Sequence, residues 1–170
     1  FGGIGLFHER SMKTNVDMIM VNIVALTNLT RLFLPDFIKR NNGKILNVSS
    51  VVSLFPGPRQ AVYFATKAYV TSFSNALYSE LSETKVTVTN LLPSTTKTEF
   101  SKVAKMGKLK IFEKTATAKS VAIDGYDGMI KGKLNVYGGV RISEKLLFWL
   151  IVHVLPRKMV LKVTKKNMTV

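Results

Sequence analysis

The stretch that decides the fold reads Lys44-Ile45-Leu46-Asn47-Val48-Ser49-Ser50, followed after a Pro- and Gly-containing connection by Tyr63-Phe64-Ala65-Thr66-Lys67. The first part is typical of a buried strand, and the second lies in a helix predicted over 60–81. Four residues of α-helix turn through about 400° and rise about 6 Å, so Tyr63 and Lys67 leave nearly the same helix face. A serine hydroxyl at the strand end can therefore share one pocket with a phenol and an ammonium group.

A parallel sheet is predicted on both sides of this stretch. Apolar residues recur at three- and four-residue spacings from 15 to 40, which predicts a helix that Pro35 kinks or shortens near its end. A second strand is predicted over 86–92, then a helix over 117–131 and a strand over 134–137. Alternating helices and strands imply parallel strands with crossover helices, and ligands bind at the carboxyl ends of such strands.

Composition bounds the class of protein. The 170 residues, 46% of them hydrophobic, are enough for one domain with a core. The chain has no cysteine, which excludes disulfides, thiol catalysis and cysteine-bound metal, and fits the cytoplasm. His8 and His153 lie far apart, so we predict no metal site.

Charge is concentrated in the second half of the chain. Lys and Arg outnumber Asp and Glu by 9 to 5 over residues 1–96 and by 16 to 5 over residues 97–170. Such a basic half suits an anionic lipid surface or a phosphorylated ligand, or simply keeps the protein soluble. Its lysines are not interleaved with aromatic residues, so we predict no nucleic-acid partner.

Several side chains in order resemble the second half of a short-chain dehydrogenase/reductase: Asn22, Ser50, Tyr63 and Lys67, then Pro93-Ser94-Thr95-Thr96-Lys97-Thr98 after the next strand. The stretch 44–67 is the most similar, and it resembles bacterial short-chain oxidoreductases and hydroxysteroid dehydrogenases.

The resemblance implies an α/β fold, a Rossmann-like doubly wound parallel sheet that here lacks its N-terminal dinucleotide-binding half. Residues 1–145 would form the C-terminal part of this domain, and residues 146–170 an apolar-then-basic tail. The glycine-rich dinucleotide fingerprint of the family is expected well upstream of the tyrosine. Gly2-Gly3-Ile4-Gly5 follows no strand, so we expect the chain to be a fragment of a longer enzyme.

The resemblance also implies the catalytic roles. Tyr63 would be the general acid or base, with Lys67 as the cation that lowers its pKa from about 10. Ser50 would hold the substrate oxygen, and Asn22 would perturb its helix and hold a water next to Lys67. Without the resemblance, Tyr63 and Lys67 could be ordinary packing and surface residues and Asn22 an interhelical hydrogen bonder. Ser49 is a rival to Ser50, and the 13-residue spacing to Tyr63 favours Ser50.

A nicotinamide cofactor is the ligand that the resemblance implies, NADP or NAD, with the choice left open. Its expected contacts are Tyr63, Lys67, Pro93, Ser94, Thr96 and Thr98. Family members usually have glycine where Ser94 stands, which bears on the fit of the cofactor. The two threonines could instead cap the next helix.

The function implied is an NAD(P)-dependent oxidoreductase that transfers a hydride between the cofactor and a carbonyl or alcohol. The alternative is a non-catalytic truncated remnant that acts as a binding or membrane-associated module. Phe100, Met106 and Phe112 could form a lid over a hydrophobic small-molecule substrate, or belong to the core. We also expect a homo-oligomer.

The tail differs from the rest of the chain. Residues 146–152 are apolar and residues 153–166 basic, and the apolar run is shorter than the roughly 20 residues that span a bilayer. An interfacial helix on an anionic membrane is one interpretation, and a helix at a subunit interface or substrate pocket is the other.

Overall fold

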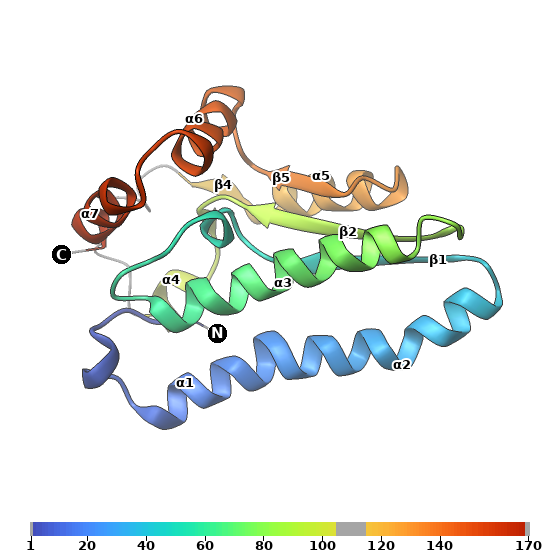
Figure 1. Cartoon of the computed structure of the whole chain (residues 1–170), viewed down its shortest axis with the longest axis horizontal. Coiled ribbons are helices and arrows are strands. Elements are labelled where there is room, and N and C mark those ends of the chain that lie inside the picture. Colours follow the sequence, from blue (N-terminus) through green and yellow to red (C-terminus); the bar gives the residue numbers. More distant parts are fainter. Residues whose placement is uncertain (1, 105–114, 169–170) are drawn as a thin grey trace.

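The predicted parallel sheet is present in the computed structural model of the chain, which describes residues 2–104 and 115–168. Its strands are β1 (Gly43–Val48), β2 (Val86–Pro93) and β5 (Asn135–Gly138), in the order β1-β2-β5. All pairs are parallel, so the carboxyl ends of the three strands meet at one edge (Figure 1).

One face of the sheet carries the first half of the helices. α1 (Met12–Ile19), the π-helical turn η2 (Met20–Ala25) and α2 (Leu26–Lys39) form one long rod beside α3 (Ala61–Glu80) (Figure 1). Four buried residues form the core under α3, namely Leu77, Leu81, Val86 and Val88. This layer fixes α3 against β1 and β2.

α5 (Ala118–Ile130) covers the opposite face and contacts all three strands. The hydroxyl of Thr117 accepts a hydrogen bond from the Ser120 N–H (3.1 Å) and so caps the helix. Leu91 and Val136 pack with Val121 on this side, whereas Val88 points to α3, as the two-residue period of a strand requires. The fold is therefore the α/β, doubly wound arrangement that was predicted.

Shorter elements surround the carboxyl edge of the sheet. They are η1 (Phe7–Glu9), η3 (Val51–Leu54), β3 (Thr96–Lys97) paired with β4 (Ala116–Thr117), and α4 (Phe100–Val103). The tail forms two helices, α6 (Ile142–His153) and α7 (Arg157–Asn167), which lie at the end of the molecule opposite the α2–β1 connection (Figure 1).

Two predictions about these elements differ from the structure. Of the two effects expected of Pro35, a kink or a shortened helix, shortening does not occur, because α2 continues to Lys39. Arg31 and Pro35 lie on the exposed side, where the carbonyl that loses its N–H partner can be solvated. β1 is not fully buried, and Val48 is 49% exposed, because within the described residues this strand pairs only with β2 and lies at the sheet edge.

Among the described residues, one helical stretch is long and apolar enough to cross a membrane, by length and composition only: Met12–Lys39, 28 residues that contain an 18-residue window with a mean hydropathy of 1.5. In the fold this stretch is the α1–η2–α2 rod that lies along α3.

Close packing of α5 on β5 provides a test of the fold. A methyl group added at Gly128 would overlap the Cγ2 atom of Val136, a side chain that is stiff in a strand. At Gly125 it would instead meet the Cδ2 end of Leu91 at 2.7 Å, which can rotate away. After allowing for better helix propensity, we expect Gly128→Ala to lower the free energy of unfolding by about 1–2 kcal/mol and Gly125→Ala to cost less.

Urea denaturation measures both variants. Val136→Ala should relieve the overlap. The double variant Gly128→Ala/Val136→Ala should therefore lose less free energy of unfolding than the two single variants lose in sum. A Gly128→Ala variant as stable as the parent would contradict this packing.

Candidate active site

A cavity of about 740 Å³ opens at the carboxyl ends of β1 and β2. Its walls come from the β1–η3 segment, the first turns of α3, the loop after β2, and α5. Most of the predicted site side chains line it, and these are Ser50, Tyr63, Lys67, Pro93, Ser94, Thr96 and Thr98. This cavity thus lies at the carboxyl edge of the parallel sheet, the predicted position of a ligand.

Tyr63 and Lys67 lie one turn apart on α3, as their spacing predicts. The Nζ atom of Lys67 donates a hydrogen bond to the carbonyl oxygen of Val48 (2.9 Å) and lies 6.0 Å from the centroid of the Tyr63 ring. The bond to the end of β1 therefore holds the ammonium beside the face of the ring.

The two adjacent serines point to different places. The Ser50 hydroxyl is hydrogen-bonded to the side chain of Tyr63 and also accepts from the Val52 N–H (3.4 Å). Ser49 is 3% exposed, and its hydroxyl donates to the Lys67 carbonyl oxygen (2.8 Å), inside the sheet–helix interface. Of the two, Ser50 is the one that can meet a ligand together with Tyr63.

Asn22 lies in the π-helical turn η2 and reaches α3 from the side. Its Nδ2 donates to the Thr66 hydroxyl (3.1 Å), which in turn donates to the Tyr63 carbonyl oxygen (2.8 Å). The structure thus gives Asn22 an interhelical hydrogen bond and places it behind the first turns of α3, outside the residues that line the large cavity.

Ser94 and the threonines after β2 have ordinary backbones. Within the described residues, the non-glycine residues with positive φ are Asn41 and Arg59, so Ser94 has no conformation that requires glycine. Ser94 N–H donates to the Gly138 carbonyl oxygen (3.0 Å). The Thr98 hydroxyl accepts from the Phe100 N–H (3.2 Å) at the start of α4, the capping role that was its alternative.

The pKa of Tyr63 moves opposite to the prediction. Burial raises it to about 12, and the hydrogen bond with Ser50 offsets only part of this rise. Burial also lowers the pKa of Lys67 to about 8. The expectation that Lys67 would lower the pKa of Tyr63 was wrong because both groups are withdrawn from water, which disfavours the charged form of each.

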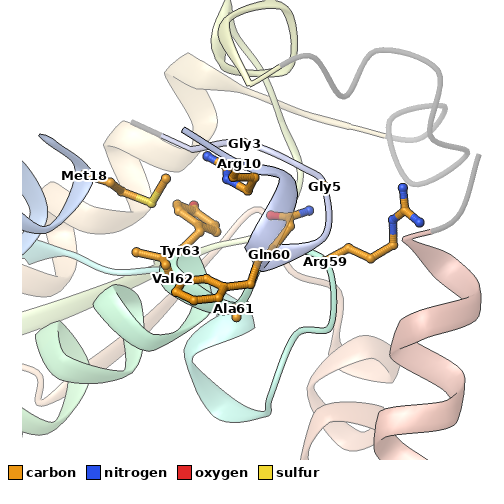
Figure 2. Close-up of a pocket in the computed structure, with 10 residues that line it drawn as sticks. Gly3, Gly5, Arg10, Met18, Arg59, Gln60, Ala61, Val62 and Tyr63 are labelled. Atoms are coloured by element: carbon orange, nitrogen blue, oxygen red, sulfur yellow. The ribbon is translucent and has the colours of Figure 1, made fainter. Parts of the chain in front are cut away.

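A second, smaller hollow of about 40 Å³ lies on the other side of Tyr63. Figure 2 shows Met18, Arg10 and Gln60 around the Tyr63 ring, with Arg59 extending away from it. The Arg10 guanidinium lies against Gly3, and its Nε donates to Asn15 Oδ1 (3.2 Å). The N-terminal segment therefore forms a polar backing for the tyrosine.

The sequence did not identify Gln60 and Met168 as cavity residues. The Gln60 side chain donates from Nε2 to the sulfur of Met168 (3.0 Å), and Met168 packs with Phe64 and Ala104. The spacing of Val160, Thr164 and Met168 could have predicted one buried helix face, but not the surface that it covers. Phe100 packs on the same cluster and its ring lies 5.5 Å from that of Tyr63, whereas Met106 and Phe112 lie outside the described residues.

Comparison with known proteins identifies the family. A family model described as short chain dehydrogenase matches residues 2–108. The chain belongs to the short-chain dehydrogenase family.

Curated relatives of this short-chain dehydrogenase include reductases. The chain is 33% identical over 122 residues to a very-long-chain 3-oxoacyl-CoA reductase of Anas platyrhynchos, covering 72% of this chain and 39% of the relative. It is 40% identical over 102 residues to a probable NADP-dependent dehydrogenase of Haemophilus influenzae, covering 59% of this chain and 40% of the relative. The chain thus spans about two fifths of the length of these relatives.

Solved structures share the fold. A 7β-hydroxysteroid dehydrogenase has a TM-score of 0.81 at 19% identity, covering 96% of this chain and 63% of the other. A short-chain dehydrogenase from Sphingobium yanoikuyae in complex with NADPH has a TM-score of 0.77 at 25% identity, covering 86% of this chain and 57% of the other. The Rossmann-like α/β fold is therefore that of the family.

The lowered pKa of Lys67 predicts a pH dependence of stability. Between pH 8 and pH 10.5 Lys67 is protonated in the unfolded chain and largely deprotonated in the folded chain. The contribution of Lys67 to the free energy of unfolding therefore rises with pH in this range. Tyr63 acts in the opposite direction only above pH 10, where the unfolded chain loses its proton first. We expect Lys67→Met to remove the rise between about pH 8 and pH 9.5.

Urea denaturation of the parent and the variant at several pH values measures this difference. Lys44→Met, at an exposed lysine on β1, is the matched control and should keep the rise. A stability difference between Lys67→Met and the parent that does not change with pH would show that Lys67 is not desolvated.

Proposed function

We propose that the protein is an NAD(P)-dependent reductase of hydrophobic carbonyl compounds, with Tyr63 as the proton donor. The observation that carries the proposal is the Ser50–Tyr63 hydrogen bond at the wall of the 740 Å³ cavity, with Lys67 one helical turn away. A substrate oxygen that contacts both hydroxyls would receive one hydrogen bond from each. This pair of donors is what the reduction of a carbonyl group to an alcohol needs beside a hydride source.

The cavity suits a nicotinamide cofactor, NADP or NAD, which when bound supplies the hydride. Lys67 would bind ribose hydroxyls, and the segment Pro93–Thr98 would offer Ser94, Thr96 and Thr98. The ordinary backbone of Ser94 supports this fit, because a serine in a left-handed conformation would be strained there. The short-chain dehydrogenase from Sphingobium yanoikuyae binds NADPH, which supports a nicotinamide dinucleotide as the cofactor.

The raised pKa of Tyr63 favours the reductive direction. At neutral pH the buried phenol keeps its proton and is ready to act as an acid. The oxygen of a carbonyl that accepts a hydride becomes an alkoxide, which is more basic than a tyrosinate even with a pKa of about 12. Proton transfer from Tyr63 to this oxygen is therefore downhill, and Ser50 holds the oxygen during the transfer.

Asn22 and Lys67 complete the proposed proton path. Asn22 braces the Tyr63 turn through Thr66, and we propose that it also holds a water near Lys67. With a pKa of about 8, Lys67 carries a proton at neutral pH and can return one to Tyr63 after each turnover.

The substrate class follows from the cavity walls. Phe64, Phe100, Val121 and Met168 line the space beyond the hydroxyls, so an apolar group attached to the carbonyl would be buried there. Several relatives are very-long-chain 3-oxoacyl-CoA reductases, which supports a long acyl chain or a similarly apolar carbonyl compound.

We further propose that the protein is a homo-oligomer and works in the cytoplasm. The α2 helix exposes Leu29, Leu32 and Phe33 on one side, an apolar strip that a second copy could cover by two-fold symmetry. A chain without cysteine suits a reducing compartment.

Replacement of the Tyr63 hydroxyl tests the function. In the full-length protein we expect Tyr63→Phe to lower the turnover of a carbonyl substrate by about 10²- to 10⁴-fold, because general acid catalysis is lost. Dinucleotide binding should remain. Tyr69→Phe, on the same helix with its hydroxyl bonded to Thr27, is the matched control and should retain activity. A Tyr63→Phe enzyme with the parental rate would refute the assignment.

Met168 provides a test of the substrate class. Met168→Trp would fill the apolar end of the cavity, so KM should rise several-fold for long-chain 3-oxoacyl substrates and little for short-chain ones. A steady-state comparison of chain lengths gives the result. Equal effects on long and short substrates would show that the acyl chain does not occupy this wall.

A further inference from the structure

The α6–α7 hairpin has one face that packs on the molecule. On α7 this face consists of Val160, Thr164 and Met168, all at most 6% exposed. On α6 the ring of Phe148 stacks on Phe55 after η3, with 6.4 Å between ring centroids. These contacts attach the hairpin beside the cavity, at the end of the molecule seen at the left of Figure 1.

The hairpin exposes an unusual number of apolar side chains, most of them on α6 and directly after it. Ten apolar side chains of this segment are exposed by 38% or more: Ile142, Leu146, Leu147, Trp149, Leu150, Val152, Val154, Met159, Leu161 and Val163. Exposed apolar side chains in this number mark a segment that meets another apolar phase. An exposed tryptophan is typical of the boundary between hydrocarbon and water.

The same segment is strongly basic. Residues 141–168 carry seven Lys and Arg residues and a single acidic residue, Glu144. The Glu144 carboxylate is already paired with Arg141 (2.8 Å). The hairpin therefore presents apolar groups within a field of positive charge, which suits an anionic partner with an apolar interior.

Two other occupants fit this surface less well. The 12 residues of α6 are about 18 Å long, too short to cross a hydrocarbon core of about 30 Å. A second copy docked by the same face would bring seven basic side chains against an identical set, and that repulsion opposes self-association.

We propose that the α6–α7 hairpin lies in the surface of an anionic lipid bilayer, with its apolar side chains among the acyl chains and its lysines and arginines at the headgroups. The hairpin would thus place the cavity wall at Met168 next to the membrane. This interaction is independent of the reaction proposed above and can be measured without it.

Vesicle binding tests the proposal on the full-length protein. We expect binding to phosphatidylserine-containing vesicles at low salt, weak binding to phosphatidylcholine vesicles, and a loss of binding as salt shortens the electrostatic range. Lys158→Glu/Lys162→Glu, at exposed positions of α7, should lower the partition coefficient on the order of tenfold. Lys44→Glu/Lys85→Glu makes the same charge change at the opposite end of the molecule and should stay within about twofold of the parent.

A second variant addresses the apolar part. Leu146→Ser/Trp149→Ser should weaken binding to anionic vesicles at every salt concentration, because the variant loses burial of apolar side chains, which salt does not screen. Thermal unfolding of each variant checks that it folds, and turnover of a water-soluble carbonyl substrate should not change in Lys158→Glu/Lys162→Glu.

Three results would overturn the proposal. The parent could fail to bind anionic vesicles at low salt. The two lysine pairs could lose binding equally, which would indicate a diffuse effect of net charge. Hairpin variants could convert a dimer to a monomer in sedimentation without any vesicle binding, which would assign the surface to a second copy.

Discussion

The site depends on a buried polar contact between α3 and the sheet. The Thr71 hydroxyl lies 2.8 Å from that of Ser49, donates to Ser53 Oγ (2.8 Å), and accepts from Asn90 Nδ2 (3.3 Å). Asn90 Nδ2 also donates to Asn135 Oδ1 on β5 (2.8 Å). All three strands are therefore tied directly or through one residue to a single turn of α3. A shift of the helix by one residue would leave these buried groups without partners, and this cost fixes its register.

That register determines the chemistry. Tyr63 and Lys67 precede Thr71 on α3 by two turns and one turn, so holding Thr71 over the end of β1 brings both to the carboxyl edge. Ser49 acts from the strand side through its bond to the Lys67 carbonyl oxygen. The neighbouring Ser50 then has to point the other way, toward the cavity, since successive residues in an extended segment face opposite sides.

Much of this arrangement could be predicted from the sequence because it is local. The helix that carries Tyr63 and Lys67, the strand 86–92 and the choice of Ser50 over Ser49 depend on spacing within short segments. The effect of Pro35 on its helix and the exposure of β1 depend on what packs around each element. The spacing of apolar residues carries no information about these neighbours. Met168 could not be assigned to the cavity, because its contact with Gln60 joins residues 108 positions apart.

The direction of the pKa changes shows the same limit. Spacing places Lys67 near Tyr63 and so predicts a Coulombic decrease in the pKa of the phenol. Desolvation depends on the groups packed around the phenol, such as the rings of Phe64 and Phe100, and in the folded protein it is the larger effect. The sequence identifies Tyr63 and Lys67 as neighbours. It does not give the dielectric environment, which decides whether the Coulombic effect or desolvation controls the pKa of Tyr63.

Met168 gives the cavity a wall that is structurally separate from the sheet. Ser50, Tyr63 and Lys67, the proposed catalytic side chains, lie in the β1–η3 connection and on α3, whereas this wall belongs to the end of the α6–α7 hairpin. Substitutions on elements that share few partners have nearly additive effects on stability. Substitutions at Met168 could therefore reshape the apolar end of the cavity while the buried polar contacts that hold Thr71 on the sheet stayed almost unchanged.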